Sequence, residues 1–207
     1  MTLGVLGGTF DPIHNGHLAA ADAAQRALRI RSITLVPSRI PPHRLDPVGA
    51  DSEHRYAMAW LAASERPGWT ASRIEIDREG PSYSYDTLAE LGQGRPSTQF
   101  FFILGADAFA EIATWSRYPA VLNLANFVVV SRPGITLDSL RERVPSAFSL
   151  RPPAETRVIL VESTTPDVSS TDIRRRVRAG ESLAGLVPPG VAHYIRSHRL
   201  YGHPIGH

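Results

Sequence analysis

Short apolar runs alternate along the chain with longer segments whose apolar residues follow helical spacing. The runs are Leu3–Leu6, Ile33–Val36, Thr70–Ile76, Gln99–Leu104, Phe127–Val130 and Arg157–Val161. Near-continuous hydrophobicity in such short runs suits strands that are covered on both faces, as in a parallel sheet. The helical segments are 16–29, 52–65, 84–92, 106–112, 115–123 and 136–143. The alternation predicts an α/β fold, a doubly wound parallel sheet flanked by helices, with ligands beyond the carboxyl ends of the strands.

After the sixth apolar run the pattern changes to two consecutive helices, 170–179 and 188–198. The length of 207 residues fits a single domain, 1–207, in which about 168–200 form a short C-terminal helical segment. The proline-rich stretch Pro37–Gly49 carries Arg39 and Arg44, and we expect it to be a flap rather than a linker.

The composition removes several kinds of chemistry. There is no cysteine, which excludes disulfides, thiolate nucleophiles and cysteine-bound zinc. There is also no lysine, so all 22 cationic side chains are arginine. Schiff-base chemistry, pyridoxal phosphate attachment and the lysine of a P-loop are therefore excluded. Any phosphate that a cationic side chain holds here must be held by arginine or histidine.

The charge and hydropathy of the chain bear on its partners. The net charge is only +2, although the isoelectric point is near 9.3, so we expect no nucleic-acid partner. No run approaches the roughly 18 apolar residues of a membrane span, and the N-terminus does not resemble a secretion signal. We therefore expect no membrane partner and a cytoplasmic location.

The segment "GGTFDPIHNGH", residues 7–17, joins the first predicted strand to the first predicted helix. Gly7 and Gly8 allow a ligand to approach the backbone closely, and Asp11-Pro12 predicts a turn. We expect a helix to start at Gly16, with free N–H groups that attract anions. The spacing matches neither G-x-G-x-x-G nor a P-loop. The segment nevertheless predicts a phosphate site.

His14 and His17 stand three residues apart at this helix start, so both imidazoles can face one phosphate group. Taken singly, either histidine also fits an ordinary strand–turn–helix junction with surface histidines. The whole segment favours the phosphate site, because the junction alone does not explain two histidines at one helix start. A zinc site is disfavoured because no third ligand stands nearby, and we expect no metal bound by protein side chains.

Two motifs of the sequence resemble those of a known superfamily. The segment at 7–17 is similar to the G-G-x-F-D-P-x-H-x-G-H signature of nucleotidyltransferases that transfer adenylyl groups from ATP. The second half of that signature, Ser-Ser-Thr-x-x-Arg, is matched by "VSSTDIR" at 168–174. The resemblance covers nearly the whole chain and implies a Rossmann-like fold. It implies catalytic roles for His14, His17 and Arg174. The implied ATP-binding residues are Gly7, Gly8, Thr9, Phe10, Gly16, Gly105, Asp107, Ser169, Ser170 and Thr171.

The C-terminal motif also makes physical sense by itself. Ser169 or Ser170 is a natural N-cap, which places a second helix start where a phosphate can bind, with Arg174 one turn into the helix. An ordinary capped surface helix is the alternative, and we accept it for the other arginines of "DIRRRVRAG", namely Arg175, Arg176 and Arg178.

Four further segments resemble the bacterial nicotinate mononucleotide adenylyltransferases. They are "PSRIPPHR" (37–44), "PSYSYDTLAEL" (81–91), "LGADAFAEIATW" (104–115) and "SRPG" (131–134). The resemblance implies that Trp115 stacks on the pyridine ring and that Ser84 and N–H groups near Tyr85 hold its carboxylate. It places Arg44 near phosphate and adds Arg132 to the mononucleotide site.

The sequence departs from that family at three positions. Ser84 replaces a threonine but keeps the hydroxyl, and Arg44 replaces a lysine but keeps the charge. Ser116 stands where the family often has tyrosine. Whether this position helps to bind the carboxylate therefore stays open. Structural roles compete with the functional ones: Trp115 lies at helical spacing from Ile112 and can be core, Tyr83 and Tyr85 can be packing residues, and Asp107 can be a helix cap.

The reaction that the resemblance implies joins ATP and nicotinate mononucleotide to give nicotinate adenine dinucleotide and pyrophosphate. Mg²⁺ would bridge the phosphates, held mostly by ligand oxygens and water. The alternatives are an adenylyltransferase for nicotinamide mononucleotide or for both forms, one for phosphopantetheine, and a nucleotide- or RNA-binding protein that uses 174–178 as a basic stripe. The sequence leaves the oligomeric state open, a homo-oligomer included.

Overall fold

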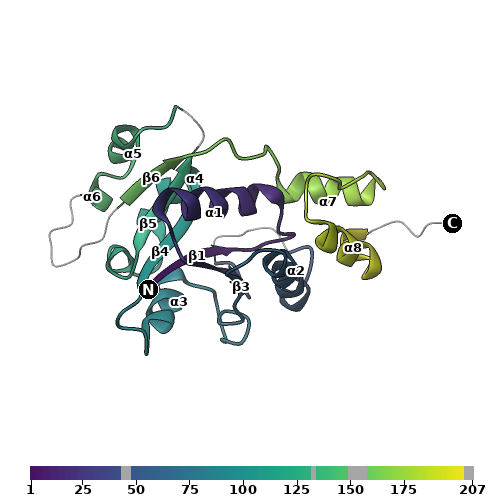
Figure 1. The fold of residues 1–207 in the computed structure, drawn as a ribbon, viewed down its shortest axis with the longest axis horizontal. Coiled ribbons are helices and arrows are strands. Elements are labelled where there is room, and N and C mark those ends of the chain that lie inside the picture. Colours follow the sequence, from purple (N-terminus) through teal and green to yellow (C-terminus); the bar gives the residue numbers. More distant parts are fainter. Residues whose placement is uncertain (43–47, 132–133, 149–157, 203–207) are drawn as a thin grey trace.

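The computed structural model describes residues 1–42, 48–131, 134–148 and 158–202. Its centre is a sheet of six strands, part of which is labelled in Figure 1. The strands are β1 (Thr2–Gly8), β2 (Ser32–Pro37), β3 (Trp69–Ala71), β4 (Gln99–Gly105), β5 (Asn126–Ser131) and β6 (Val158–Glu162). Their order is β3-β2-β1-β4-β5-β6, and every neighbouring pair is parallel. The doubly wound α/β fold is therefore confirmed.

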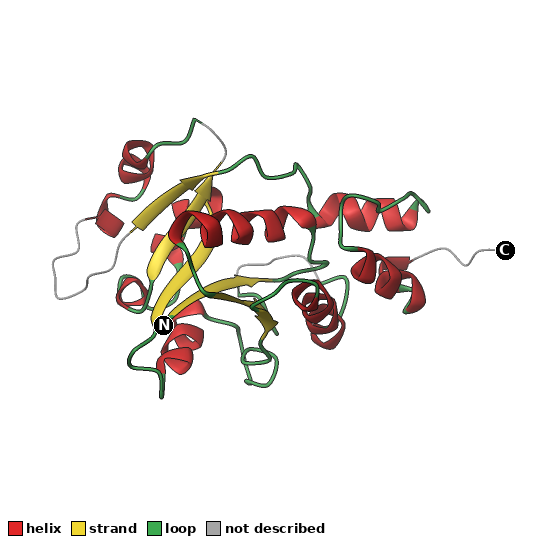
Figure 2. Cartoon of the chain, in the orientation of Figure 1, coloured by secondary structure: helices red, strands yellow, loops and turns green. Residues whose placement is uncertain are grey.

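Helices connect the strands, as Figure 2 shows in red. They are α1 (Asn15–Leu28), α2 (Ser52–Ser64), α3 (Ser84–Gly92), α4 (Ala106–Ala110), α5 (Leu137–Arg143), α6 (Pro145–Phe148), α7 (Ser170–Arg178) and α8 (Pro189–Ser197). Short 3-10 turns lie at Ile112–Thr114, Ala120–Asn123 and Leu200–Gly202. Among the described residues, no helix is long and apolar enough to cross a membrane.

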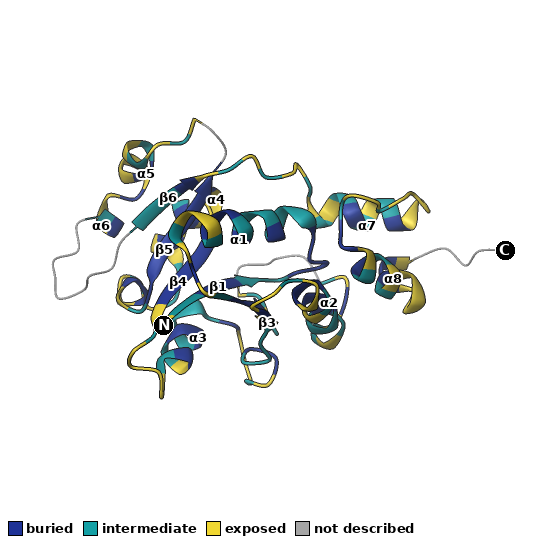
Figure 3. Cartoon of the chain, in the orientation of Figure 1, coloured by how far each residue is buried: buried dark blue, intermediate teal, exposed yellow. Residues whose placement is uncertain are grey.

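The sheet is covered on both faces, because successive strand residues pack into two different cores. Figure 3 shows most of β4 and β5 as buried. On β4, Phe101 and Ile103 pack with residues of α1, α2, α7 and α8, whereas Phe102 and Leu104 pack with residues of α3, α4 and α5. The alternation follows from the two-residue period of a strand. It explains why the strands contain almost only apolar residues.

Two predicted elements differ from the structure. The strand expected to reach Ile76 ends at Ala71, and the chain turns at 74–76, which buries both Glu75 and Ile76. The helix expected over 115–123 is absent, because Trp115 is extended and only Ala120–Asn123 forms a 3-10 turn. Pro119 lacks the N–H that a continuous helix would need. Arg157, the first residue of the last predicted strand, lies outside the described residues.

The strand order reverses between β1 and β4, and in open α/β sheets ligands bind at such a reversal. The carboxyl ends of these two strands are Gly8 and Gly105. Both belong to segments that the sequence assigns to ATP. The fold thus brings the first motif to the crevice where a nucleotide is expected.

Candidate active site

The loop after β1 is built around a buried phenylalanine. Gly7 and Gly8 are the last residues of β1 itself rather than the start of the loop. Phe10 has a positive φ of 50° and is 1% exposed. A Cβ at Gly8 would lie 2.9 Å from the Phe10 ring, so the ring needs glycine there. Asp11 and Pro12 form the predicted turn.

Helix α1 begins at Asn15, one residue before the predicted start, and His14 is its N-cap. The N–H of His17 donates to Nδ1 of His14 at 3.4 Å, and the N–H of His14 donates to Nδ1 of His17 at 3.3 Å. The rings stack with centroids 3.6 Å apart. A Cβ at Gly16 would lie 3.1 Å from the His14 ring, so glycine makes room for this arrangement. The two histidines therefore close a capping box.

The reciprocal bonds fix the protonation of both rings. Since each Nδ1 accepts a backbone N–H, the proton of each neutral ring is on Nε2. Burial lowers the pKa of His14 to about 4. Burial and the neighbouring His14 hold the pKa of His17 well below its usual value. At neutral pH the pair offers two uncharged Nε2–H donors at the start of α1.

The second motif lies beside the first, as the shared signature implies. Ser170, the first residue of α7, donates its hydroxyl to the carbonyl of Pro12 at 3.0 Å. Arg174 donates to the carbonyl of Asp11 at 2.8 Å and to the Thr171 hydroxyl at 3.3 Å. Ser169 is the N-cap, and its hydroxyl accepts the N–H of Asp172. The start of α7 is thus bonded to the loop after β1.

Asp11 links a third segment to these two. Its carboxylate accepts the N–H groups of Gly49 and Ala50 at 2.8 and 3.0 Å and lies 3.5 Å from the guanidinium of Arg174. The side chain is 1% exposed. The acid of the first motif therefore holds the residues before α2 and the arginine of the second motif in one place.

The remaining arginines of α7 lie on the surface, as expected. Arg175 and Arg176 form ion pairs with Asp172 and Glu181. These acids balance much of the positive charge that an RNA-binding stripe would need. The structure therefore does not favour the RNA-binding alternative.

A cavity of about 420 Å³ lies at the reversal of strand order. Five residues that the sequence assigned to the site line it: Gly7, Gly8, Thr9, Ser84 and Trp115. Ser116, the departure from the family tyrosine, lines it as well. The end of β1 and the predicted acceptor residues therefore share one cavity, whereas His14, His17 and Arg174 do not line it.

Trp115 is half-buried and packs edge-on against Phe102, with ring centroids 5.9 Å apart. The ring is thus anchored by the core while it lines the cavity. Ser84 is the first residue of α3, whose N-cap, Tyr83, makes no side-chain capping bond. An uncapped helix start beside a cavity favours an anionic ligand such as a carboxylate.

The cavity also contains a carboxylate that the sequence reading missed. Glu75 is 6% exposed, and the Thr87 hydroxyl donates to it at 2.6 Å. Ser82 also bonds to it, and burial raises the pKa of Glu75 above its usual value. The missed signal lies in the strand prediction: on an edge strand this glutamate would face solvent, whereas the turn at 74–76 buries it.

Other predicted residues stand apart from the cavity lining. Tyr85 packs against the core of α3 and α4, with the guanidinium of Arg117 4.8 Å from its ring centre. Gly105 is the N-cap of α4, and Asp107 is exposed in the first turn without acting as the cap. Arg44 and Arg132 lie outside the described residues.

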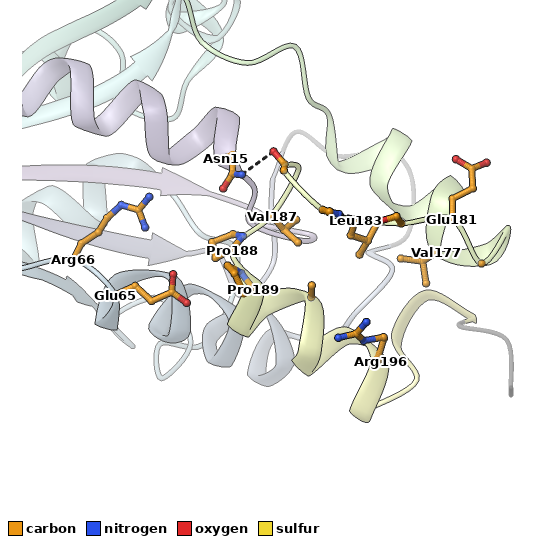
Figure 4. A pocket seen from close by; sticks show the side chains of 15 residues that line it. Asn15, Glu65, Arg66, Val177, Glu181, Leu183, Val187, Pro188, Pro189 and Arg196 are labelled. Carbon is orange, nitrogen blue, oxygen red and sulfur yellow. Dashed lines mark hydrogen bonds between the residues drawn. The ribbon is translucent and has the colours of Figure 1, made fainter.

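A larger cavity, of about 820 Å³, lies between the start of α1, the end of α2 and the segments around α7 and α8 (Figure 4). Asn15 donates its side-chain amide to the carbonyl of Gly185 at its rim. The charged groups around it are of both signs, Glu65 with Arg66 and Glu181 with Arg196. Since none of the predicted site residues lines it, size alone does not identify the site.

The sequence profile of the cytidylyltransferase-like family matches residues 5–176. A protein of Roseiflexus sp. (strain RS-1) named "Probable nicotinate-nucleotide adenylyltransferase" is 43% identical over 199 residues, which cover 96% of this chain and 97% of that protein. A protein of Frankia alni with the same name is 43% identical over 95% of this chain and 98% of its own length. The chain belongs to the nicotinate-nucleotide adenylyltransferase family. The resemblance seen in the motifs is thereby confirmed.

Solved structures show that the fold is shared well beyond these relatives. The nicotinic acid mononucleotide adenylyltransferase of Plasmodium falciparum complexed with NaAD superposes with a TM-score of 0.77 at 20% identity, over 99% of both chains. The same protein complexed with APC gives a TM-score of 0.76 at 18% identity. The same topology is therefore found in a protein that differs from this chain at most positions.

Proposed function

We propose that this chain transfers the adenylyl group of ATP to nicotinate mononucleotide, which gives nicotinate adenine dinucleotide and pyrophosphate. The observation that carries the proposal is identity of 43% over 96% of the chain to a relative with this name. The cavity at the strand reversal, which is lined by the end of β1 and the start of α3, is consistent with it. The product is the acid form of the dinucleotide in NAD biosynthesis.

In the proposed mechanism an oxygen of the acceptor's 5′-phosphate attacks the α-phosphorus of ATP in line, and pyrophosphate leaves. No protein nucleophile is needed, which agrees with a chain that lacks cysteine and lysine. Catalysis then consists of positioning and of stabilising charge on phosphate oxygens. We assign His14 and His17 to this second task, because their Nε2–H groups are neutral donors beside a helix start.

Arg174 is proposed to hold the leaving pyrophosphate together with the start of α7. Its bonds to Asp11 and Thr171 occupy only part of the guanidinium, which carries several N–H groups. The backbone around Gly7, Gly8 and Thr9 is proposed to approach the triphosphate.

We propose that Mg²⁺ enters this site bound to the substrate phosphates. Among the described residues, no group of three or more histidine, aspartate or glutamate side chains is arranged to hold a metal. Asp11 is engaged by two backbone N–H groups. When bound, Mg²⁺ would neutralise phosphate charge, with phosphate oxygens and water as most of its ligands.

For the acceptor we propose that Trp115 stacks on the pyridine ring and that the start of α3, with Ser84, binds the carboxylate. A carboxylate would receive charge-assisted hydrogen bonds there, whereas an amide would set its own N–H groups against protein donors. Each unpaired buried donor costs about 1–3 kcal/mol. Preference for the acid by a factor on the order of 10² or more follows.

A second candidate, use of nicotinamide mononucleotide or of both forms, is favoured by one observation. Glu75 lines the same cavity and could accept the N–H of an amide. Its bonds from Thr87 and Ser82 reduce that capacity without removing it. In this proposal the preference between acid and amide depends on whether the mononucleotide binds mainly to the N–H groups at the start of α3 or to the Glu75 carboxylate.

The deciding experiment measures pyrophosphate release from ATP with each mononucleotide. We expect kcat/KM for nicotinate mononucleotide to exceed that for the amide, and Ser84→Ala to reduce the difference. Trp115→Ala should weaken mononucleotide binding about tenfold or more while ATP affinity is retained, since base stacking contributes about 1–3 kcal/mol. Trp60→Ala is the matched control, because Trp60 is an exposed tryptophan on α2. Equal kcat/KM values for acid and amide would favour the second candidate.

A further inference from the structure

One buried arginine contacts both sides of the site, and the sequence reading gave it no role. Arg55 lies on α2 and is 1% exposed. Its Nε donates to the carbonyl of Ala50 at 3.1 Å, and Nη1 donates to that of Thr9 at 2.7 Å. Nη1 also donates to the carbonyl of Ser38, and Nη2 to that of Arg39 at 3.0 Å. Four backbone carbonyls are therefore bound by a single guanidinium.

These carbonyls belong to three segments that only the fold brings together. Thr9 follows β1, Ser38 and Arg39 follow β2, and Ala50 precedes α2. In Figure 1 the carboxyl end of β1 lies beside α2. A planar guanidinium with several fixed donors can join such separate carbonyls, whereas a single ammonium group cannot match the same geometry.

The bound segments continue into both halves of the site. Thr9 and Ser38 line the cavity. On the ATP side, Ala50 donates its N–H to Asp11, which also lies against Arg174. On the acceptor side, the N–H of Arg39 donates at 2.9 Å to the hydroxyl of Ser82, which lines the cavity as well.

We infer that Arg55 is a positioning residue for the reaction, which fixes the loop after β1 relative to the segment after β2. The inference rests on the proposed function, because in-line transfer requires both substrates at one set distance. Arg55 acts through the backbone of Thr9, Ser38 and Arg39. A shift of about 1 Å between reacting groups can lower a rate on the order of 10²-fold.

The test compares Arg55→Gln and Arg55→Lys with Met58→Ala. Met58 is a buried residue on the same helix and packs in the core, so its truncation lowers stability without removing a bond to either loop. Steady-state kinetics with ATP and nicotinate mononucleotide are measured where circular dichroism shows each variant folded. Hydrogen exchange of residues 8–10 and 38–39 is followed in parallel.

We expect Arg55→Gln to lower kcat on the order of 10²-fold while both KM values change far less, with Arg55→Lys between it and the wild type. Backbone protection at 8–10 and 38–39 should fall together in Arg55→Gln and stay unchanged in Met58→Ala. A folded Arg55→Gln with the kcat of Met58→Ala would overturn the inference. If Arg55→Gln does not fold, Arg55→Lys takes its place in the same comparison. Failure of both to fold would also overturn it, because Arg55 would then serve the fold itself.

The proposed function is tested separately by the wild type. If the wild-type protein releases no pyrophosphate with either mononucleotide, that function fails. The exchange data still show whether Arg55 couples the two loops, since they do not depend on turnover.

Discussion

Two helix starts lie side by side at this site, and they use their polar side chains differently. At α1 the capping groups are the rings of His14 and His17, and each keeps a proton on Nε2 after its Nδ1 has capped the helix. At α7 the hydroxyl of Ser170 is bonded to Pro12, and Arg174 is bonded to Asp11. The first start keeps donors that are free to meet the proposed ligand, whereas several side chains of the second are bonded to the loop before the first.

We infer from the comparison that the two halves of the proposed phosphate site have different tasks. A two-faced side chain such as histidine can cap a helix and still donate outward, because its two nitrogens are separate. A serine hydroxyl has a single proton, which Ser170 gives to the loop after β1. We therefore expect substitutions at α1 to affect turnover most and substitutions at α7 to affect the loop that α7 supports.

The largest expected effect is that of His17→Ala. Loss of one preorganised donor to transition-state charge lowers kcat by about 10²–10³-fold. His17→Gln, whose amide can place an N–H near the former Nε2, should recover part of the loss. His54→Ala, at a histidine on α2 outside the site, is the control. A His17→Ala enzyme with near-normal kcat would contradict the phosphate role at α1.

The next effect is on stability against pH and concerns the neutral state of the pair. The folded pKa of His14 is about 4, below its usual 6.5, so the folded state binds fewer protons than the unfolded state between these values. The contribution to stability is therefore present above pH 6.5 and is lost as the pH falls through 4. For a residue 7% exposed this amounts to about 3 kcal/mol in the free energy of unfolding.

Urea unfolding at several pH values between 7 and 4 measures this loss in the wild type and in His14→Asn. The asparagine oxygen can still cap α1 but does not titrate. Glu75 has a raised pKa, so its contribution to stability changes with pH in the opposite direction above pH 4.5. Because both proteins contain Glu75, this contribution cancels when their unfolding free energies are subtracted. Identical pH dependence in both proteins would mean that the His14 ring is not held neutral.

Arg174→Ala should have a smaller effect on turnover than His17→Ala, of about tenfold. The substitution removes the hydrogen bond to the Asp11 carbonyl and takes the guanidinium away from the buried Asp11 carboxylate. We expect this to lower the free energy of unfolding by about 1–3 kcal/mol. Arg178→Ala, on the same helix, is the matched control. A loss of kcat as large as that of His17→Ala would break the comparison, because α7 would then contact the transition state as directly as α1 does.

The sequence predicted these two helix starts because their signals are local. The apolar runs predicted the order of strands and helices. The two motifs were predicted at the carboxyl end of a strand and at the starts of helices, which are the places where ligands bind in such folds. It predicted the start of α1 at Gly16 because histidine is not among the preferred N-caps, so His14 was not recognised as one. It missed Glu75 because Ile74 and Ile76 alternate as in a strand. Arg55 carries no local signal for its role, since three of its four carbonyl partners lie 16 to 46 residues away in the sequence.

The smallest expected effect distinguishes the two serines at the start of α7. Ser170→Ala removes the bond to the Pro12 carbonyl, and the net contribution of such a bond is about 0.5–1.5 kcal/mol. Because that bond reaches the loop before His14, we expect a loss of a few-fold in kcat as well. Ser169→Ala, which removes the cap on Asp172, should cost a similar amount of stability and lower kcat less than Ser170→Ala does. Urea unfolding and steady-state kinetics on both variants make the comparison. Equal kcat in the two would show that α7 does not hold the phosphate loop through Ser170.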